Sequence, residues 1–319
     1  MSEPSATASP AASAGRLTVQ AVLKTDVGLV RTENQDSATL TTPREEAGSH
    51  TGGRLMVVAD GMGGHRGGAT ASRMAVETVK TTYLGNASDD VPAALREALA
   101  RANARVYTES QSNAELRGMG TTTSALVVRG GEAWFGHVGD SRIYMVRGNE
   151  IKQLTDDHSL VATMVREGLL TTAEAENHPR RNVLQRSVGA VGVAEDVDAD
   201  VRGPIELQEG DVFILCSDGL HGVVKEEEMI GPAKLPIARA AEELVRLALE
   251  RGAPDNVTVI VAKVIRADAP SEETETDAVL FDDTIREERR RAAAASSTPP
   301  TPTAGAEVGE TPRSRPPTR

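Results

Sequence analysis

Aromatic side chains and cysteine are scarce in this sequence. It contains three Phe, three Tyr and a single Trp, so a core must be built from Val, Leu, Ile, Ala and Met. A hydrophobic share of 39% over 319 residues still allows a sizeable core, in one large domain or two small ones. The single cysteine, Cys216, excludes an internal disulfide and favours a reducing compartment.

Excess positive charge and long apolar runs are also missing. A formal net charge of -12 argues against a nucleic-acid groove and an anionic membrane surface, and suits cations or basic peptides. No stretch approaches the roughly 18 consecutive apolar residues that a membrane span requires. The first 15 residues have neither the basic nor the apolar part of a secretory signal. We therefore expect a cytoplasmic, monomeric protein with no nucleic-acid partner and no membrane span.

The stretch 55–64, LMVVADGMGG, combines an apolar strand with an acid and a glycine turn. Asp60 stands at the exit of the strand, and Gly61, Gly63 and Gly64 let the backbone turn sharply with its carbonyl groups exposed. A carboxylate and free carbonyl groups at a strand end outline a site for a hard cation. Without the rest of the chain, an equally good interpretation is that Asp60 only caps the following helix.

Two kinds of nucleotide-binding loop are excluded at this turn. The phosphate-loop pattern counted from Gly63 requires a Lys after Gly68, where the chain has Ala69. The dinucleotide-binding pattern counted from Gly61 requires a glycine where Arg66 stands. Both patterns fail at required residues.

Hydrophobic periodicity predicts one mixed domain of antiparallel sheets covered by helices. Expected strands cover 17–23, 121–128, 132–138, 142–146, 151–154, 211–216 and 256–264, and expected helices cover 67–83, 91–110, 159–167 and 237–251. The four strands between 121 and 154 resemble a meander. The polar stretch 31–36 alone favours a solvated turn, and the long connection 157–202 is typical of a functional flap.

The ends of the chain differ in composition from the middle. A leader rich in Ser, Ala and Pro covers 1–15, and a charged tail rich in Pro, Thr and Ser covers 268–319. Neither end can build a core, so both are expected to be disordered around a domain at 16–267.

Five aspartates occupy short polar turns beside apolar strands. They are Asp36, Asp60, Asp140, Asp218 and Asp255. Because strand ends of a sandwich gather at one edge, these carboxylates can converge, and converging carboxylates require cations among them. Ligation by oxygen alone favours magnesium or manganese over zinc. The six histidines are scattered, and His137, within a strand, is interpreted as structural.

Six motifs occur in a characteristic order: GLVRTENQD, VVADGMGGH, GMGTT, HVGDSRIY, LCSDGL and APDNVTVIV. In this order they resemble the motif series of the bacterial metal-dependent serine/threonine protein phosphatases of the PPM type, or type 2C. The resemblance covers about residues 17–265. It implies an α+β fold, a four-layer α/β/β/α sandwich in which two central antiparallel β-sheets are flanked by pairs of helices, with metals at one end.

The same resemblance implies a role for each motif residue. Asp60 would bridge two Mn2+ or Mg2+ ions, and the carbonyl group of Gly61 would bind one of them. Asp218 and Asp255 would complete the other site, and Asp36 would act through a water molecule.

A further arginine and aspartate match the motifs. Arg31 would bind the substrate phosphate, and its planar fork suits two parallel hydrogen bonds to phosphate oxygens. Asp140 would hold a third, weaker metal together with Asp218, and 157–202 would be the mobile flap. Water would attack phosphorus directly, without a covalent intermediate. Substrates would be phosphorylated proteins, targets of bacterial serine/threonine kinases or the kinases themselves.

The sequence departs from many eukaryotic members at two positions. Gln35 replaces a glutamate, which lowers the negative charge of the site. Met62 replaces a histidine that is a candidate general acid, and His65, three residues later, is not assigned that role. A metal-bound water is then the expected proton donor.

Three alternative functions can be weighed against the same sequence. A phosphatase with a cysteine nucleophile requires Arg six positions after Cys216, where Gly222 stands. An inactive relative that binds phosphoproteins predicts a missing metal aspartate, and none is missing. A phosphatase acting on anti-sigma-factor antagonists usually carries a sensor domain, for which this chain has no room.

Overall fold

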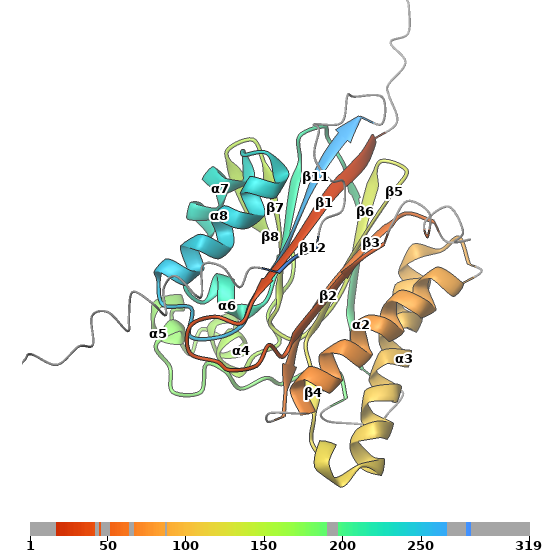
Figure 1. Ribbon diagram of the computed structural model, residues 1–319, viewed down its shortest axis with the longest axis vertical. Coiled ribbons are helices and arrows are strands. Elements are labelled where there is room, and N and C mark those ends of the chain that lie inside the picture. Colours follow the sequence, from red (N-terminus) through yellow and green to blue (C-terminus); the bar gives the residue numbers. More distant parts are fainter. Residues whose placement is uncertain are drawn as a thin grey trace, which may run out of the picture. The chain divides into compact units, whose positions relative to one another are not determined.

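Two β-sheets form the centre of the computed structural model (Figure 1). The structure describes residues 17–41, 45, 52–63, 67–86, 88–189, 197–266 and 279–281. The leader 1–15 and nearly all of the tail 268–319 lie outside these residues, as does His65. No helix in the described ranges is both long and apolar enough to cross a membrane.

The first sheet has the strand order β12-β1-β11-β10-β7-β8. Its strands are β1 (Leu17–Asp26), β7 (Arg142–Arg147), β8 (Glu150–Gln153), β10 (Val212–Cys216), β11 (Val257–Arg266) and β12 (Val279–Phe281). All neighbours are antiparallel except β12, which pairs in parallel with β1. The long strands β1 and β11 pair over their full lengths, from Leu17 opposite Arg266 to Asp26 opposite Val257.

The second sheet has the strand order β2-β3-β5-β6-β9, and the short β4 pairs with the end of β3. Its strands are β2 (Asp36–Leu40), β3 (Arg54–Met62), β4 (Gly120–Thr121), β5 (Thr123–Arg129), β6 (Glu132–Val138) and β9 (Asp200–Glu206). All pairs are antiparallel. The register of β2 against β3 puts Asp36 directly opposite Asp60, so both carboxylates start from the same end of the sheet.

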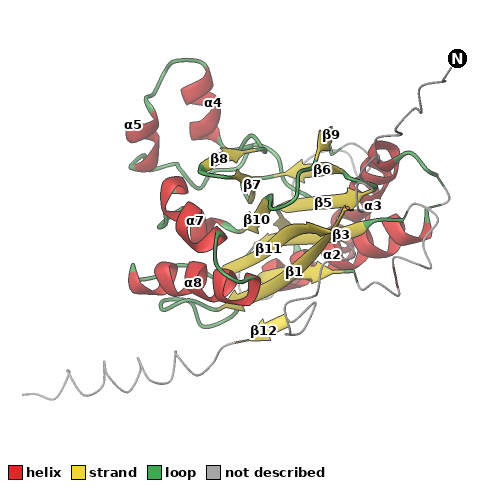
Figure 2. Ribbon diagram, turned by 90° about the horizontal axis from the view of Figure 1, so that it is seen from above, coloured by secondary structure: helices red, strands yellow, loops and turns green. Residues whose placement is uncertain are grey.

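Two pairs of helices cover the outer faces of the sheets. The helices of the described residues are α2 (Gly67–Gly85), α3 (Val91–Ser112), α4 (Leu160–Arg166), α5 (Thr172–Glu176), α6 (Asp218–His221), α7 (Glu226–Ala233) and α8 (Ile237–Glu250), with a 3-10 turn at Ala114–Leu116. The pair α2 and α3 lies on the second sheet and the pair α7 and α8 on the first (Figure 1). Figure 2 shows α4 and α5 beyond β7 and β8, apart from both pairs. This arrangement confirms the predicted α+β sandwich with four layers.

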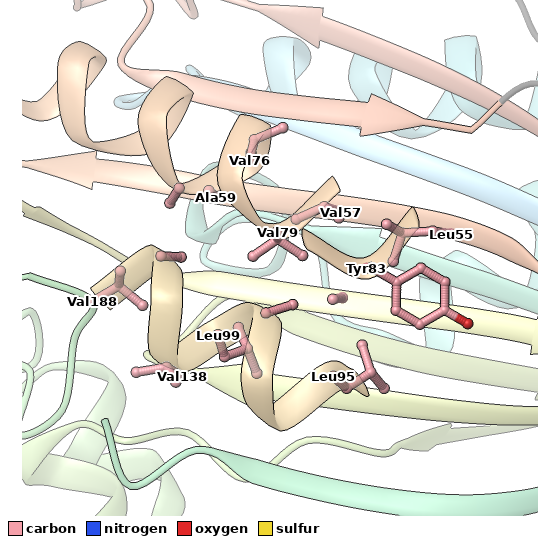
Figure 3. Close-up of a cluster of buried hydrophobic side chains, with 14 of the residues drawn as sticks. Leu55, Val57, Ala59, Val76, Val79, Tyr83, Leu95, Leu99, Val138 and Val188 are labelled. Carbon is pink, nitrogen blue, oxygen red and sulfur yellow. The ribbon is translucent and has the colours of Figure 1, made fainter. Parts of the chain in front are cut away.

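Strand β3 connects two hydrophobic cores. Its residues Leu55, Val57 and Ala59 face α2 and α3, where they pack with a cluster shown in Figure 3. The alternate residues Met56 and Val58 face the first sheet and join the core between the sheets. Because successive side chains of a strand point to opposite faces, burial of both faces explains the unbroken apolar run in the sequence.

The predicted meander is wrong, because its strands belong to different sheets. β5 pairs with β6 in the second sheet, and β7 pairs with β8 in the first. The chain crosses between the sheets at the turn containing Gly139, whose φ of 111° is available mainly to glycine. The tight turn therefore does not make a hairpin, and it places Asp140 between the sheets' ends.

Besides the short β4, three strands were absent from the sequence prediction. They are β12, which lies in the tail that was expected to be disordered, and β2 and β9, which form the two edges of the second sheet. β9 is largely exposed, contains Pro204 and pairs with β6 through a register shift. Edge strands tolerate polar residues and proline because one side makes no ladder hydrogen bonds, so periodicity does not reveal them.

Candidate active site

The five predicted aspartates lie at one end of the two sheets. Asp36 begins β2, Asp60 lies near the end of β3, and Asp140 occupies the turn between β6 and β7. Asp218 follows β10 at the start of α6, and Asp255 immediately precedes Asn256 and β11. The loop from β1 to β2, α6 and the helices α4 and α5 all lie toward the bottom of Figure 1. The predicted convergence of strand ends is therefore present in the structure.

A cavity of about 360 Å³ opens among these strand ends. Its lining consists of Arg31, Thr32, Glu33, Gln35, Asp60, Gly61, Met62, Gly63, Thr122, Asp140, Asn182, Leu184, Asp218, Asp255 and Asn256. Four of the five predicted aspartates contribute to the lining. The fifth, Asp36, is close enough for the charges of Asp218 and Asp255 to act on it, but it lies behind the cavity wall.

Asp36 is half-buried, and only part of its hydrogen-bonding capacity is used. The hydroxyl of Ser217 donates to Asp36 Oδ2 over 2.7 Å, while Oδ1 has no hydrogen-bond partner among the described residues. Burial raises the pKa of Asp36 to about 7, partly opposed by hydrogen bonds from Ser217 and Thr258. The neighbouring Asp218 carboxylate raises this pKa further. A buried carboxylate of this kind needs positive charge beside it to stay ionised.

Burial and neighbouring negative charges also raise the pKa values of the carboxylates that line the cavity. Burial, followed by the charges of Asp36 and Asp218, raises the pKa of Asp60 well above its usual value. Burial and the charge of Asp218 raise the pKa of Asp140 to about 8. Burial and Asp255 likewise raise the pKa of Asp218, and Asp218 Oδ1 has no hydrogen-bond partner among the described residues.

This donor set fits hard divalent cations. Asp36 Oδ1 and Asp218 Oδ1 have no partners among the described residues, and a cation bound near these carboxylates would take up such oxygens as ligands and offset the repulsion between the charges. Within the described ranges, no group of three or more His, Cys, Asp or Glu side chains is placed so that it could hold a metal ion by itself. Backbone carbonyl groups and water would therefore supply the remaining ligands, which is usual for magnesium, because it retains several waters.

Arg31 lies at the mouth of the cavity and forms an ion pair with Asp255. Its Nη2 is 2.7 Å from Asp255 Oδ2. The hydrogen bond and the charge of Asp255 raise the pKa of Arg31 above its ordinary value. The guanidinium is half-exposed, so its remaining donors can reach an anion entering from solvent.

The loop that carries Arg31 is fixed by Asn256, which sequence reasoning did not identify. Asn256 Nδ2 donates to the carbonyl oxygens of Val27 (3.0 Å) and Glu33 (2.9 Å). Asn256 Oδ1 accepts from the backbone N–H of Gln35 over 2.8 Å. One side chain thus ties both ends of the Arg31 loop to the start of β11. Its only sequence signal is its place between Asp255 and an apolar strand.

The glycine turn after Asp60 permits close backbone contact. A Cβ on Gly61 would lie 2.1 Å from the carbonyl oxygen of Gly68, in the first turn of helix α2. The N–H of Gly61 donates to the carbonyl oxygen of Gln35 over 3.1 Å. The two acidic strand ends and the helix are therefore packed backbone against backbone.

The predicted flap contributes one wall of the cavity. Its segment after α5 brings Asn182 and Leu184 to the lining, and the charge of Arg181 lowers the pKa of Asp218. The flap is joined to the sheets by a bridge between Thr121 and Val188. Residues 190–196 of the predicted flap lie outside the described ranges.

Two other residues considered in the sequence lie outside the cavity lining. Cys216 is completely buried in β10, and burial raises the pKa of its thiol to about 12, so it is not poised as a nucleophile. His137 is completely buried in β6, and its Nδ1 lies 2.9 Å from the hydroxyl of Ser124. Burial lowers the pKa of His137 to about 4, so the ring is neutral at neutral pH.

Comparisons with known proteins agree with this geometry. Residues 31–258 match the sequence profile of the family described as Protein phosphatase 2C. The serine/threonine protein phosphatase PstP of Mycobacterium tuberculosis is 35% identical over 253 residues, which are 79% of this chain and 46% of that protein. The chain thus matches about half the length of this relative. The protein phosphatase PhpP of Streptococcus pneumoniae is 38% identical, over 77% of this chain and 98% of that protein.

Solved structures show the same fold. The serine/threonine phosphatase of S. agalactiae has a TM-score of 0.70 at 32% identity, covering 77% of this chain and 99% of that one. The catalytic domain of the phosphatase PstP, solved in complex with two manganese ions, has a TM-score of 0.66 at 34% identity. That similarity covers 78% of this chain and 99% of the PstP domain.

Proposed function

This chain belongs to the protein phosphatase 2C family, and on that premise we propose that it is a metal-dependent protein serine/threonine phosphatase. The observation that supports the activity best is the convergence of four aspartates at a cavity with an arginine at its mouth, together with the unsatisfied oxygens of Asp36 and Asp218. All five predicted aspartates are present, so no feature favours an inactive phosphoprotein-binding role.

The residues of the site divide into those that would hold cations and one that would bind phosphate. The first group is Asp36, Asp60, Gly61 through its carbonyl group, Asp140, Asp218 and Asp255. Two Mn2+ or Mg2+ ions, with a third held weakly at Asp140, would supply a nucleophilic water at neutral pH and offset the negative charge of the phosphoryl group. The unsatisfied oxygens of Asp36 and Asp218 support this assignment.

Arg31 would bind the substrate phosphate. A guanidinium presents two parallel N–H donors to phosphate oxygens, and this bidentate geometry fixes the orientation of the group as well as its position. Asn256 holds the two ends of the Arg31 loop, so the arginine starts from a defined position. Orientation of the phosphoryl group accounts for much of the rate in reactions of this class.

The proton needed by the leaving seryl or threonyl oxygen would come from water. Met62 lines the cavity where a histidine is found in many eukaryotic members, and a thioether carries no transferable proton. The buried His137 is absent from the lining.

The substrates are proposed to be proteins phosphorylated by bacterial serine/threonine kinases, and the kinases themselves. The relatives named above come from bacteria and carry the name of serine/threonine or protein phosphatases, which supports this class of substrate. We also propose that residues 16–267 form the phosphatase domain and that it acts as a monomer in the cytoplasm.

The decisive experiment is hydrolysis of a phosphothreonine peptide by the full chain, with and without manganese. Asp60→Asn and Asp218→Asn remove one charge each without changing shape, and both are expected to abolish turnover. Cys216→Ala serves as the control, because it removes a buried group outside the cavity. Turnover without divalent cations, or turnover retained by both aspartate variants, would refute the proposed function.

A further inference from the structure

The GMGTT motif, residues 118–122, has no part in the chemistry proposed above, although it was one of the motifs that stood out in the sequence. Its last residue, Thr122, lies between β4 and β5 and touches the cavity, yet it is 1% exposed. Buried polar side chains in this position require partners. The partners of Thr122 belong to the two acidic turns on either side of it.

On one side, Thr122 holds the backbone of Asp60. The N–H of Asp60 donates to Thr122 Oγ1 over 2.8 Å, and the N–H of Thr122 donates to the Asp60 carbonyl oxygen over 2.9 Å. The hydroxyl of Thr121 donates to the same carbonyl oxygen over 2.7 Å. Both backbone polar groups of Asp60 are therefore fixed by the two threonines, and the start of the Asp60 side chain is fixed with them.

On the other side, Thr122 contacts the turn that contains Asp140. Its Oγ1 lies 2.6 Å from Ser141 Oγ. Because Thr122 Oγ1 accepts the Asp60 N–H, its own proton can be donated to Ser141. A Cβ on Gly139 would lie 2.6 Å from both Cβ and Cγ2 of Thr122, so the methyl side of the threonine packs directly against that glycine. Thr122 thus contacts the residues before and after Asp140.

Two further buried groups hold Ser141 in place. The hydroxyl of Ser124 donates to the Ser141 carbonyl oxygen over 3.0 Å, and it lies 2.9 Å from His137 Nδ1. The imidazole of His137 therefore extends the same hydrogen-bond network. Ser124, His137 and Ser141 are all completely buried. The network therefore runs from Asp60 through Thr122 and Ser141 to Ser124 and His137.

We propose that Thr122 and Ser141 are positioning residues for the phosphatase reaction, whose hydroxyl pair holds the Asp60 and Asp140 turns in a fixed relation. This inference rests on the proposed function, because it assigns the network to the cation-binding carboxylates. Residues that orient metal ligands typically change metal affinity or activity by about 10- to 100-fold when they are replaced. The effect should therefore be measurable without loss of the fold.

Two substitutions of Thr122 separate its hydroxyl from its methyl group. Thr122→Val keeps the branched shape that packs on Gly139 but cannot accept from Asp60 or donate to Ser141. Thr122→Ser keeps the hydroxyl and loses the methyl group. We expect manganese binding, measured by calorimetry on the full chain, to weaken by roughly 10-fold or more in Thr122→Val. Thr122→Ser should lose clearly less, and kcat for a phosphothreonine peptide should follow the same order.

A matched control is available in α2. Thr78 is buried, its hydroxyl donates to the Met74 carbonyl oxygen (2.6 Å) and accepts from Arg105 (3.0 Å), and it is not part of the cavity lining. Thr78→Val removes a buried hydroxyl in the same way, so it reports general destabilisation. It should leave manganese affinity within twofold of the unsubstituted chain.

Ser141→Ala tests whether the two hydroxyl groups act together. If they form one unit, the loss of manganese affinity in the double variant Thr122→Val with Ser141→Ala will be smaller than the product of the two single losses. Thermal unfolding in chelator shows whether each variant is folded before metal is added.

The possible outcomes distinguish this inference from the function on which it rests. An unsubstituted chain that binds no manganese would overturn both. A chain that binds manganese and turns over peptide, while folded Thr122→Val does so equally well, would overturn only the positioning role. The positioning role would also be overturned if Thr122→Ser were impaired more than Thr122→Val, because packing of the methyl group would then be what matters.

Discussion

Arg31 Nη2 lies 2.7 Å from Asp255 Oδ2, so the arginine proposed to bind phosphate is paired with an aspartate proposed to bind a cation. The two side chains are 54% and 31% exposed, and an ion pair this accessible contributes at most about 1 kcal/mol. A cation can therefore take over Asp255 while a phosphate takes over Arg31. The pair keeps the arginine at the cavity mouth without holding it strongly.

Arg31→Lys is expected to raise KM for a phosphothreonine peptide by about 10-fold, with a smaller change in kcat. Lysine keeps the charge and the ion pair with Asp255, but an ammonium group cannot offer two parallel N–H donors to phosphate. Steady-state kinetics at saturating manganese would measure both constants. An unchanged KM would show that Arg31 does not bind the phosphate.

The metal-free protein should lose stability as the pH rises from about 4 to about 8. The pKa of Asp36 is about 7 in the folded protein, against an ordinary value of 3.8, and that of Asp140 is about 8. A raised carboxyl pKa means that the folded state holds its proton more tightly, so this contribution is complete below 3.8 and is lost as the pH passes the folded pKa. Thermal unfolding in chelator across this range measures the slope.

Asp36→Asn provides the control for this pH dependence. Asparagine can still accept the hydrogen bond from Ser217 but has no charge to bury, so the fall in stability with pH should become shallower. Added manganese should also restore stability to the unsubstituted chain at pH 8, because it neutralises the same carboxylates. A slope unchanged by Asp36→Asn would mean that other groups cause the pH dependence.

The residue pattern was sufficient to predict antiparallel sheets covered by helices and the convergence of the acidic turns, whereas the four layers followed from the resemblance to PPM-type phosphatases. Strands such as β3 and β11 are buried on both faces, so they appear as unbroken apolar runs, and each acidic turn next to such a strand is visible locally. The order of the strands in the sheets was not visible in the same way. The turn at Gly139 could connect two paired strands as a hairpin or lead the chain from one sheet to the other. Packing between the sheets decides which, and the residues of the turn do not reveal that packing.

The residues that support the site were also beyond sequence reasoning. Ser217 contacts Asp36 across 181 positions of the chain, and Asn256 contacts Gln35 across 221. In the sequence, each of these partners is only a serine or an asparagine. Many other serines and asparagines in the chain look the same, so nothing marks these two as part of the site. The cluster of aspartates was predictable because each of them occupies a short polar turn beside an apolar strand. Their individual hydrogen-bond partners come only from the folded chain.

Cys216→Ala should retain turnover and lose about 1 kcal/mol of stability, as is typical when a small buried group is removed. The thiol is buried with a pKa raised to about 12, so thiolate chemistry is not accessible to it near neutral pH. The native protein should accordingly react with a thiol reagent only on unfolding. Inactivation of the native protein at a rate matching modification of Cys216 would revive a cysteine mechanism.

Asn256→Ala should separate the placement of Arg31 from the chemistry of the acidic cavity. It removes the two hydrogen bonds to the Val27 and Glu33 carbonyl oxygens and the one from Gln35, leaving a loss of roughly 2 to 4 kcal/mol. Because the Arg31 loop would then move more freely, KM should rise by a larger factor than kcat falls.

The control for Asn256 is Asn86→Ala, in the connection between α2 and α3. Its side-chain Nδ2 donates to Glu97 Oε2 over 2.6 Å, and its side-chain Oδ1 accepts from the backbone N–H of Ser88 over 2.7 Å. Neither Glu97 nor Ser88 lines the cavity of the candidate site. This change should leave KM and kcat unaltered. If Asn256→Ala lowers kcat alone, with KM intact and the protein folded, then Asn256 acts on the neighbouring Asp255 and not through the Arg31 loop. Asn256 lies beside both Asp255 and the Arg31 loop, so comparing the changes in KM and kcat shows through which of the two it acts.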